Sequence, residues 1–210
     1  MKYLNIFALA VVSMIMLNCT KNDETTVILL GQESYIQDII KVVPDTLQAT
    51  FTEHFGMIHE GYIPPKIEGN FVVSKKKRVY SNIAESWPLQ VVEPDMYLTI
   101  TDQHNREAKL ILAEATSTET DTVYIVGNDA YFTMYYVEDK VMTFLGYNTK
   151  IKRAVLFNGE ICDWGIKNLY AASVILDAYD NSGGSLVQYK KGDFFIYKDE
   201  DGLSERKTEE

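Results

Sequence analysis

Two cysteines and three histidines are the side chains of this 210-residue chain best suited to supply a nucleophile, a metal ligand or a covalent attachment point. Cys19 ends an apolar N-terminal segment and is followed at once by charged residues, whereas Cys162 lies far along the chain in the segment GEICDWG. The two thiols could form a disulfide or react singly, and Cys19 could also carry a membrane anchor.

The histidines do not have the spacing of a metal site. His54 and His59 are five residues apart across a predicted helix end, which does not match the His-x-x-x-His pattern on one helical face. His104 lies in the predicted turn TDQHN. We expect exposed or capping histidines, and we predict neither a metal site nor a cofactor.

Catalytic motifs give no candidate nucleophile or base. The chain has no Gly-x-Ser-x-Gly segment, no phosphate-binding loop and no Cys-x-x-Cys pair. The segment KDEDGLSE at 198–205 has only the first ligands of a calcium loop and is better interpreted as a solvated turn. We therefore predict that the protein is not an enzyme.

The N-terminus has the pattern of an export signal. Lys2 precedes the apolar residues 4–17, which are too few to span a bilayer as a helix, since a span needs about 20 residues. The run then ends in Met-Leu-Asn-Cys, which resembles the lipobox of bacterial lipoproteins. That resemblance implies removal of residues 1–18, acylation of Cys19 and a practically permanent membrane anchor. Cys162 would then have no cysteine partner within the chain, and we interpret it as a small buried side chain.

Composition limits the partners. Thirty acidic and twenty basic residues give a net charge of −10, which opposes binding to nucleic acid. The only basic cluster, KKKR at 75–78, is expected to be a charged strand edge, with contact to lipid phosphates as the alternative. The 192 residues after the signal are enough for one domain, and we expect a monomer.

A pair of helices is predicted between the anchor and the rest of the domain. Ile36, Ile39, Ile40 and Val43 form one apolar helical face. Pro44 suits the first position of a second helix, whose apolar residues are Leu47, Phe51 and Phe55 and whose stop signal is Gly56.

After the proline-containing connector GYIPPKIEGNF at 61–71, the apolar residues recur at every second position. Residues 96–101, 108–113 and 131–137 alternate as strands do, and turns too short for parallel crossovers separate successive strands. Several strands are apolar on both faces, which favours a barrel with helices outside it, or a sandwich. We expect a mainly β fold: an antiparallel up-and-down barrel of about eight or nine strands with the helical pair packed outside.

Three segments add a family resemblance: PPKIEGNFVV at 64–73, GIKNLYAASVILDAYD at 165–180 and GDFFIYKDEDGLSE at 192–205. Together with the lipobox they resemble uncharacterised lipoproteins of Bacteroidota-type bacteria with a calycin-like, lipocalin-like barrel. The resemblance implies anchoring in the bacterial outer membrane, facing either the cell surface or the periplasm. The expected regions are a signal peptide at 1–18, lipidated Cys19 with a tether at 19–26, helices at 27–56, the barrel at 57–198 and an acidic tail at 199–210.

Aromatic residues are the best candidates for ligand contacts. Tyr131, Tyr135, Phe144 and Tyr147 lie in one predicted hairpin and could line a lumen that takes a small lipophilic or saccharide ligand. Ordinary core packing is the other interpretation of these rings, and it is the one that we favour, although the ligand-binding barrel stays our leading hypothesis for the protein as a whole. The sequence therefore predicts a ligand-binding barrel, with a filled barrel that contacts proteins or glycans as the second hypothesis.

Overall fold

The computed structural model describes residues 36–61, 63–83, 93–114, 117–144, 147–179 and 189–207, without the side chains of residues 117, 142–144, 147 and 148. The predicted signal peptide, Cys19 and the tether lie outside the described residues. In the described part of the chain, no helix combines the length and the apolar character that a membrane crossing requires.

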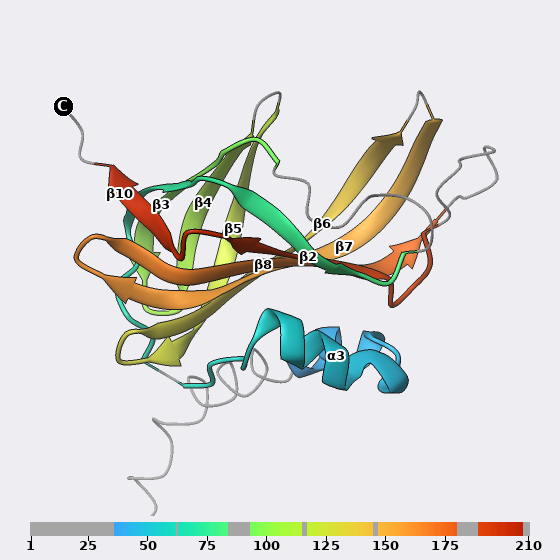
Figure 1. The fold of residues 1–210 in the computed structure, drawn as a ribbon, viewed down its shortest axis with the longest axis horizontal. Helices are drawn as coiled ribbons and strands as arrows, with labels where there is room; N and C mark the ends of the chain where they lie inside the picture. Colours follow the sequence, from blue (N-terminus) through green and yellow to red (C-terminus); the bar gives the residue numbers. More distant parts are fainter. Residues whose placement is uncertain are drawn as a thin grey trace, which may run out of the picture. The chain divides into compact units, whose positions relative to one another are not determined.

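Ten antiparallel strands form one sheet, in the order β10-β1-β3-β4-β5-β6-β7-β8-β9-β2 (Figure 1). Their bounds are β1 Gly69–Val73, β2 Lys76–Ser81, β3 Met96–His104, β4 Glu107–Glu114, β5 Ser117–Asn128, β6 Tyr131–Phe144, β7 Tyr147–Cys162, β8 Gly165–Ala178, β9 Phe194–Asp199 and β10 Leu203–Lys207. From β3 to β9 each strand pairs with the next in sequence, as the short turns predict, although the loop between β8 and β9 lies largely outside the described residues.

The first and last strands close the sheet into a ring. β1 pairs with β10, and β2 pairs with β9, so that residues 69–81 run antiparallel to residues 194–207. β8 pairs with β9 through Tyr170–Val174 and with β10 through Gly165–Lys167. Because β1 with β2 and β9 with β10 each occupy one position of the ring, the ten strands make an antiparallel barrel of eight positions, which confirms the predicted fold class.

The C-terminal segment differs from its prediction. Residues 203–207, assigned from the sequence to an acidic tail, form β10 instead, with Ser204 buried. The backbone pairing with β1 and β8 outweighs the polar composition of these five residues.

Two helical segments precede the strands, as predicted: residues 36–42 and α3 Asp45–Phe55. Pro44 is the residue before α3 rather than its first helical residue. Gly56 ends α3 with a positive φ of 90°, and its amide donates a 2.9 Å hydrogen bond to the Thr52 carbonyl. Glycine adopts this conformation without strain, so the predicted helix end is confirmed.

The helices pack on the outer face of the sheet. The predicted apolar face, including Ile36, Ile39 and Val43, joins Phe51 and Phe55 in one buried cluster with outward-facing residues of β5 to β9. Phe51 meets Phe194 of β9 edge to face, with ring centroids 5.2 Å apart. This cover explains why several strands are apolar on both faces.

A second cluster fills one half of the barrel interior. Inward-facing residues alternate along each strand, and their rings and branched chains form a continuous core. Its members include Phe71, Met96, Leu98, Ile100, Ala108, Leu110, Val123, Ile125, Phe132, Met134, Val155 and Phe157. The apolar core defines the inner face of β3 to β8, which also contribute to the site.

Candidate ligand-binding site

The inner faces of neighbouring strands change from apolar to charged along their length. On β4 the inward residues run from Leu110 to Glu114, and on β6 they run from Phe132 to Lys140. Because neighbouring strands are antiparallel and paired in register, these changes occur at one end of the barrel. We call this end the charged lumen, and its inward charged residues are Lys76, Arg78, Glu93, Glu114, Glu119, Asp121, Glu138, Lys140 and Arg153.

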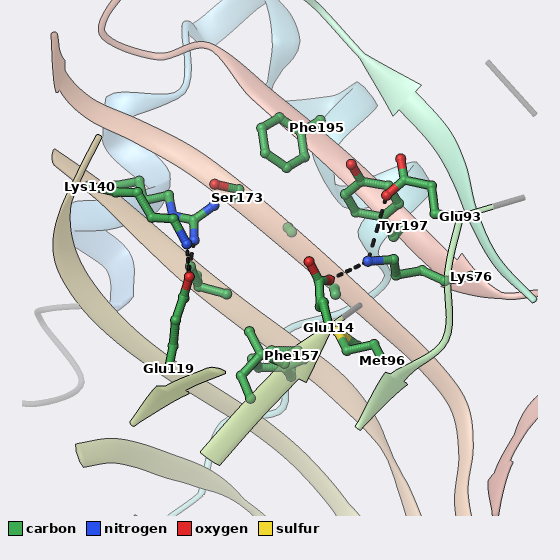
Figure 2. A pocket seen from close by; sticks show the side chains of 15 residues that line it. Lys76, Glu93, Met96, Glu114, Glu119, Lys140, Phe157, Ser173, Phe195 and Tyr197 are labelled. Carbon is green, nitrogen blue, oxygen red and sulfur yellow. Dashed lines mark hydrogen bonds and ion pairs between the residues drawn. The ribbon is translucent and has the colours of Figure 1, made fainter. Parts of the chain in front are cut away.

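A cavity of about 270 Å³ lies within the charged lumen (Figure 2). Its apolar wall includes Met96, Leu112, Val155, Phe157 and Phe195. Its polar wall includes members of two ion-pair clusters, together with Ser173 and Tyr197. Figure 2 shows the two clusters on either side of the cavity, with Phe195 and Tyr197 beside the second one.

The first cluster comes from β5, β6 and β7. Lys140 pairs with Glu119, and Arg153 pairs with Glu138 through an Nε–Oε1 hydrogen bond of 2.6 Å. Arg153 Nη2 also lies 3.6 Å from Glu119 Oε2. The Arg153 side chain is only 11% exposed, so these charges interact in a medium that screens them less than water does.

The second cluster joins β2, β4 and β9 to the segment before β3. Lys76 pairs with Glu114 and lies 3.6 Å from Glu93. Arg78 Nη2 donates to Glu93 at 2.9 Å and to the Tyr197 hydroxyl at 2.6 Å. Both cations also lie about 5.1 Å from the centroid of the Tyr197 ring, within the range of a cation–π contact.

The basic segment 75–78 therefore differs from its prediction. Lys75 and Lys77 project outward to the β9–β10 turn, where they pair with Asp201 and Glu200. Lys76 and Arg78 alternate with them and are buried in the lumen, contrary to the expected charged surface. Burial of these two cations is sustained by carboxylates from distant parts of the sequence.

Burial changes the ionisation of the charged lumen. Desolvation, reinforced by Arg153 and partly opposed by Glu114, lowers the pKa of Lys140 to about 8. Desolvation and the nearby Glu138 raise the pKa of Asp121, against the effect of Arg153. Burial likewise raises the pKa of the Tyr136 hydroxyl, so this group stays neutral at physiological pH.

Three buried polar atoms of this region have no hydrogen-bond partner among the described residues. They are Ser173 Oγ, Glu119 Oε2 and the Tyr136 hydroxyl. Ser173 and Glu119 line the cavity, and Tyr136 lies on the same inner face of β6 as Glu138 and Lys140. Native proteins leave few such atoms unsatisfied, so these atoms indicate a place for a polar ligand or ordered water.

The aromatic residues chosen from the sequence do not lie in this cavity where their side chains are described. Tyr135 is buried on the outer face beneath the helices, and Tyr131 is 45% exposed and packs at a tilt against His59. The alternation was right, but the inner face of β6 carries Phe132, Met134 and Tyr136 instead. Phe144 and Tyr147 have side chains outside the described residues, and their role stays a prediction.

The other candidate residues are dispersed. His54 stacks on Tyr80, and His59 packs at a tilt against Tyr131, each with ring centroids 4.9 Å apart. Cys162 is a half-buried free thiol at the end of β7. Within the described ranges, no group of three or more His, Cys, Asp or Glu side chains is arranged to hold a metal ion.

Sequence reasoning missed the charged lumen, although one signal for it was present. Glu138 and Lys140 continue the inward alternation of Phe132, Met134 and Tyr136, so following that face along the strand would have placed two charges inside the barrel. Comparison with protein-family models, curated proteins and solved structures finds no match to this chain.

Proposed function

We propose that this protein is a lipid-anchored, non-enzymatic component of the bacterial outer membrane that binds a small molecule in the charged lumen of its barrel. The observation that carries the proposal is a cavity lined by buried polar atoms that have no hydrogen-bond partner among the described residues. A ligand that supplies those partners would gain hydrogen bonds that the protein alone does not make there.

The dimensions of the interior favour a compact ligand. The volume of about 270 Å³ is near the lower limit of ligand pockets, which commonly span about 300 to 1,000 Å³. Beyond the cavity, the apolar half of the interior is occupied by side chains such as Phe71, Phe132 and Phe157. A long acyl tail would therefore have to extend out of the barrel, so we favour a small polar ligand over a lipid.

Anchoring and location rest on the sequence. The apolar run before Cys19 and its resemblance to a lipobox support acylation of Cys19, with the barrel tethered to the outer membrane and facing the surface or the periplasm. Replacement of Cys19 by Ala should release the protein into the soluble fraction. Membrane retention of that variant would contradict the anchor.

A second function, contact with another envelope protein or a glycan, has one observation in its favour. At the end of the barrel opposite the charged lumen, Trp164 in the β7–β8 turn is 77% exposed, and Met57 and Ile63 are 71% and 82% exposed. Contiguous apolar patches are typical of interaction surfaces, and these three side chains are the candidates for such a patch at this end of the barrel. The cavity leads us to rank this function second.

Catalysis ranks third, even though titratable groups converge on the lumen. Perturbed pKa values are typical of active sites, but ion-pair networks perturb pKa values as well. Lys140, Arg153 and Lys76 each pair with a carboxylate, so the arrangement matches a binding site held open by ion pairs.

The proposal is tested by the mass of the purified protein. The acylated protein is extracted from membranes, and its mass is compared under non-denaturing and denaturing conditions. We expect an excess mass of small-molecule size that is lost on denaturation. Absence of any excess mass would overturn the proposal and favour the interaction function.

Two matched variants locate the ligand. Ala171→Phe adds an aromatic ring to the cavity wall and should abolish the excess mass. Ala113→Phe adds the same ring at a half-buried position that is out of phase with inward-facing Leu112 on β4, and it should retain the excess mass. Equal excess mass in both folded variants would place the ligand elsewhere and contradict binding in the lumen.

A further inference from the structure

We infer that the ligand of the charged lumen carries no net charge and presents hydroxyl groups, as a single sugar ring or a small cyclic polyol does, with Glu119 and Ser173 as the residues that recognise those hydroxyls. This inference rests on the proposed function and specifies its ligand class.

The charge balance of the lumen is the first argument. Four cations and five carboxylates face one another, and each of Lys76, Arg78, Lys140 and Arg153 has at least one carboxylate partner. An anionic ligand would compete with carboxylates that are already in place. A cationic ligand would lie beside Lys140 and Arg153. A ligand without net charge avoids both penalties, because it leaves the ion pairs intact.

The ionisation of the lumen residues supports this argument. The pKa of Lys140 is lowered and the pKa of Asp121 is raised, both mainly by desolvation. The lumen thus disfavours a positive charge at one position and a negative charge at another. An added headgroup of either sign would meet the same desolvation.

The two cavity atoms that make no hydrogen bond to the described residues specify the polar group more closely. Glu119 Oε2 can only accept a hydrogen bond, whereas Ser173 Oγ can both donate and accept. A ligand hydroxyl can donate to Glu119 and at the same time accept from a neighbouring donor. An ionised carboxylate cannot donate to Glu119. An ammonium group can donate to both atoms but leaves the Ser173 hydroxyl proton without an acceptor, and it adds the positive charge that the charge balance disfavours. Hydroxyl groups match both atoms.

The cavity walls add a preference for a ring. Phe157, Phe195 and Tyr197 line the cavity, and the rings of Phe195 and Tyr197 meet edge to face at 5.5 Å. Aromatic surfaces pack against the apolar C–H face of a compact ring, while the ion-pair clusters meet its polar edge. This combination fits a small cyclic polyol better than a flexible chain.

The test uses probes of similar size that differ in charge. Full-length protein in detergent is titrated at pH 7 by calorimetry and ligand-observed NMR with glucose, myo-inositol, glucuronate and glucosamine. We expect at least one neutral probe to bind about tenfold more tightly than glucuronate and glucosamine. A charged probe would disturb at least one charge-assisted hydrogen bond of the ion-pair clusters, and such a bond is worth roughly a factor of ten in affinity. Tighter binding of either charged probe would overturn the inference.

Two variants separate recognition from folding. Ser173→Ala should weaken binding of the neutral probe several-fold without lowering the melting temperature, because the hydroxyl that it removes has no partner among the described residues. Glu119→Gln should weaken binding as well, but it also disturbs the Lys140 ion pair, so Ser173→Ala is the decisive variant. Unchanged affinity in folded Ser173→Ala would overturn the role of Ser173.

The outcomes also distinguish this inference from the proposed function. If all four probes bind equally, or none binds, while the ligand that copurifies is still lost from Ala171→Phe, the lumen binds a ligand of another class and only this inference fails. If no excess mass is present in the purified protein and no probe binds, both fail.

Discussion

The two halves of the barrel interior share β3 to β8 and differ in the side chains that those strands direct inward. In the apolar half, Phe71, Phe132 and Phe157 fill the space completely enough to form one buried core. In the charged lumen, long side chains such as Lys140 and Arg153 pair with carboxylates across the interior and leave a cavity between them. The strand framework therefore supplies the enclosure, and the choice of inward side chains decides whether it is filled or open.

The apolar half should dominate stability. Phe132→Ala removes a fully buried ring and should lower the free energy of unfolding by about 4 kcal/mol. Urea denaturation measures this change. The neighbouring Tyr131→Ala, on the opposite face and 45% exposed, is the control and should cost less than about 1 kcal/mol. Similar losses in both variants would mean that Phe132 is not part of a tightly packed core.

Substitutions in the charged lumen should lower the free energy of unfolding less than Phe132→Ala does, and their effects should depend strongly on one another. Arg153→Leu leaves Glu138 without its 2.6 Å partner and should lower the free energy of unfolding by about 2 kcal/mol. The double variant Arg153→Leu with Glu138→Leu should lose less than the two single losses combined, because it buries no unpaired charge. Additive losses would contradict a coupled cluster.

An exposed ion pair provides the reference for that experiment. Lys109 and Asp102 lie 3.0 Å apart with side chains 64% and 57% exposed. Lys109→Leu should change the free energy of unfolding by no more than about 0.5 kcal/mol. A loss as large as that of Arg153→Leu would remove the distinction between the lumen pairs and the surface pairs.

A pH-dependent effect on stability is predicted for two aspartates with opposite pKa shifts. Burial raises the pKa of Asp199 to about 6, although the Ser204 hydroxyl, which donates to it at 2.6 Å, acts in the other direction. Burial also acts to raise the pKa of Asp201, but hydrogen bonds from Asp199, the Leu203 amide and the Ser74 hydroxyl lower it overall. The ionised form is therefore disfavoured at Asp199 and favoured at Asp201.

These shifts predict opposite pH dependences. The contribution of Asp199 to stability is complete below pH 4 and is lost as the pH rises through 6, so Asp199→Asn should become the more stable protein above pH 6, by about 1 kcal/mol. Asp201 contributes stability above pH 4 that is lost in acid, so Asp201→Asn should be less stable than the wild type only near neutral pH. The urea midpoints of both variants and the wild type are measured at pH 4 and pH 7.5. At pH 7.5 Asp199→Asn should have a higher midpoint than the wild type and Asp201→Asn a lower one. A shift of both variants in the same direction would contradict the opposite pKa shifts.

Local pattern was sufficient to predict most of the fold. The apolar face of residues 36–43, the helix stop at Gly56 and the alternation in 131–137 follow from side-chain period and glycine geometry. The strand LSERK at 203–207 could not be predicted, because it has one apolar residue and owes its conformation to β1 and β8.

The candidate site was harder to predict, because its residues depend on partners distant in the sequence. Period two separates Tyr135 from Phe132 and Tyr136, but it does not tell which face is inside when helices cover the outer one. Lys76 and Arg78 would be costly to bury alone, and their partners Glu93 and Glu114 become visible only when the strands are assembled. Charge in the interior is a tertiary property.

The ring closure between residues 69–81 and 194–207 has a consequence for how the chain folds. The successive hairpins from β3 to β8 can form between near neighbours, whereas Asn70 meets Lys207 only after most of the chain has been ordered. Such distant pairings make folding slow, because the entropy lost in closing a long loop is recovered only at the end. Until then, β1 and β8 present open edges that could pair with other chains, so the newly made protein should be most prone to aggregation just before the last strand joins.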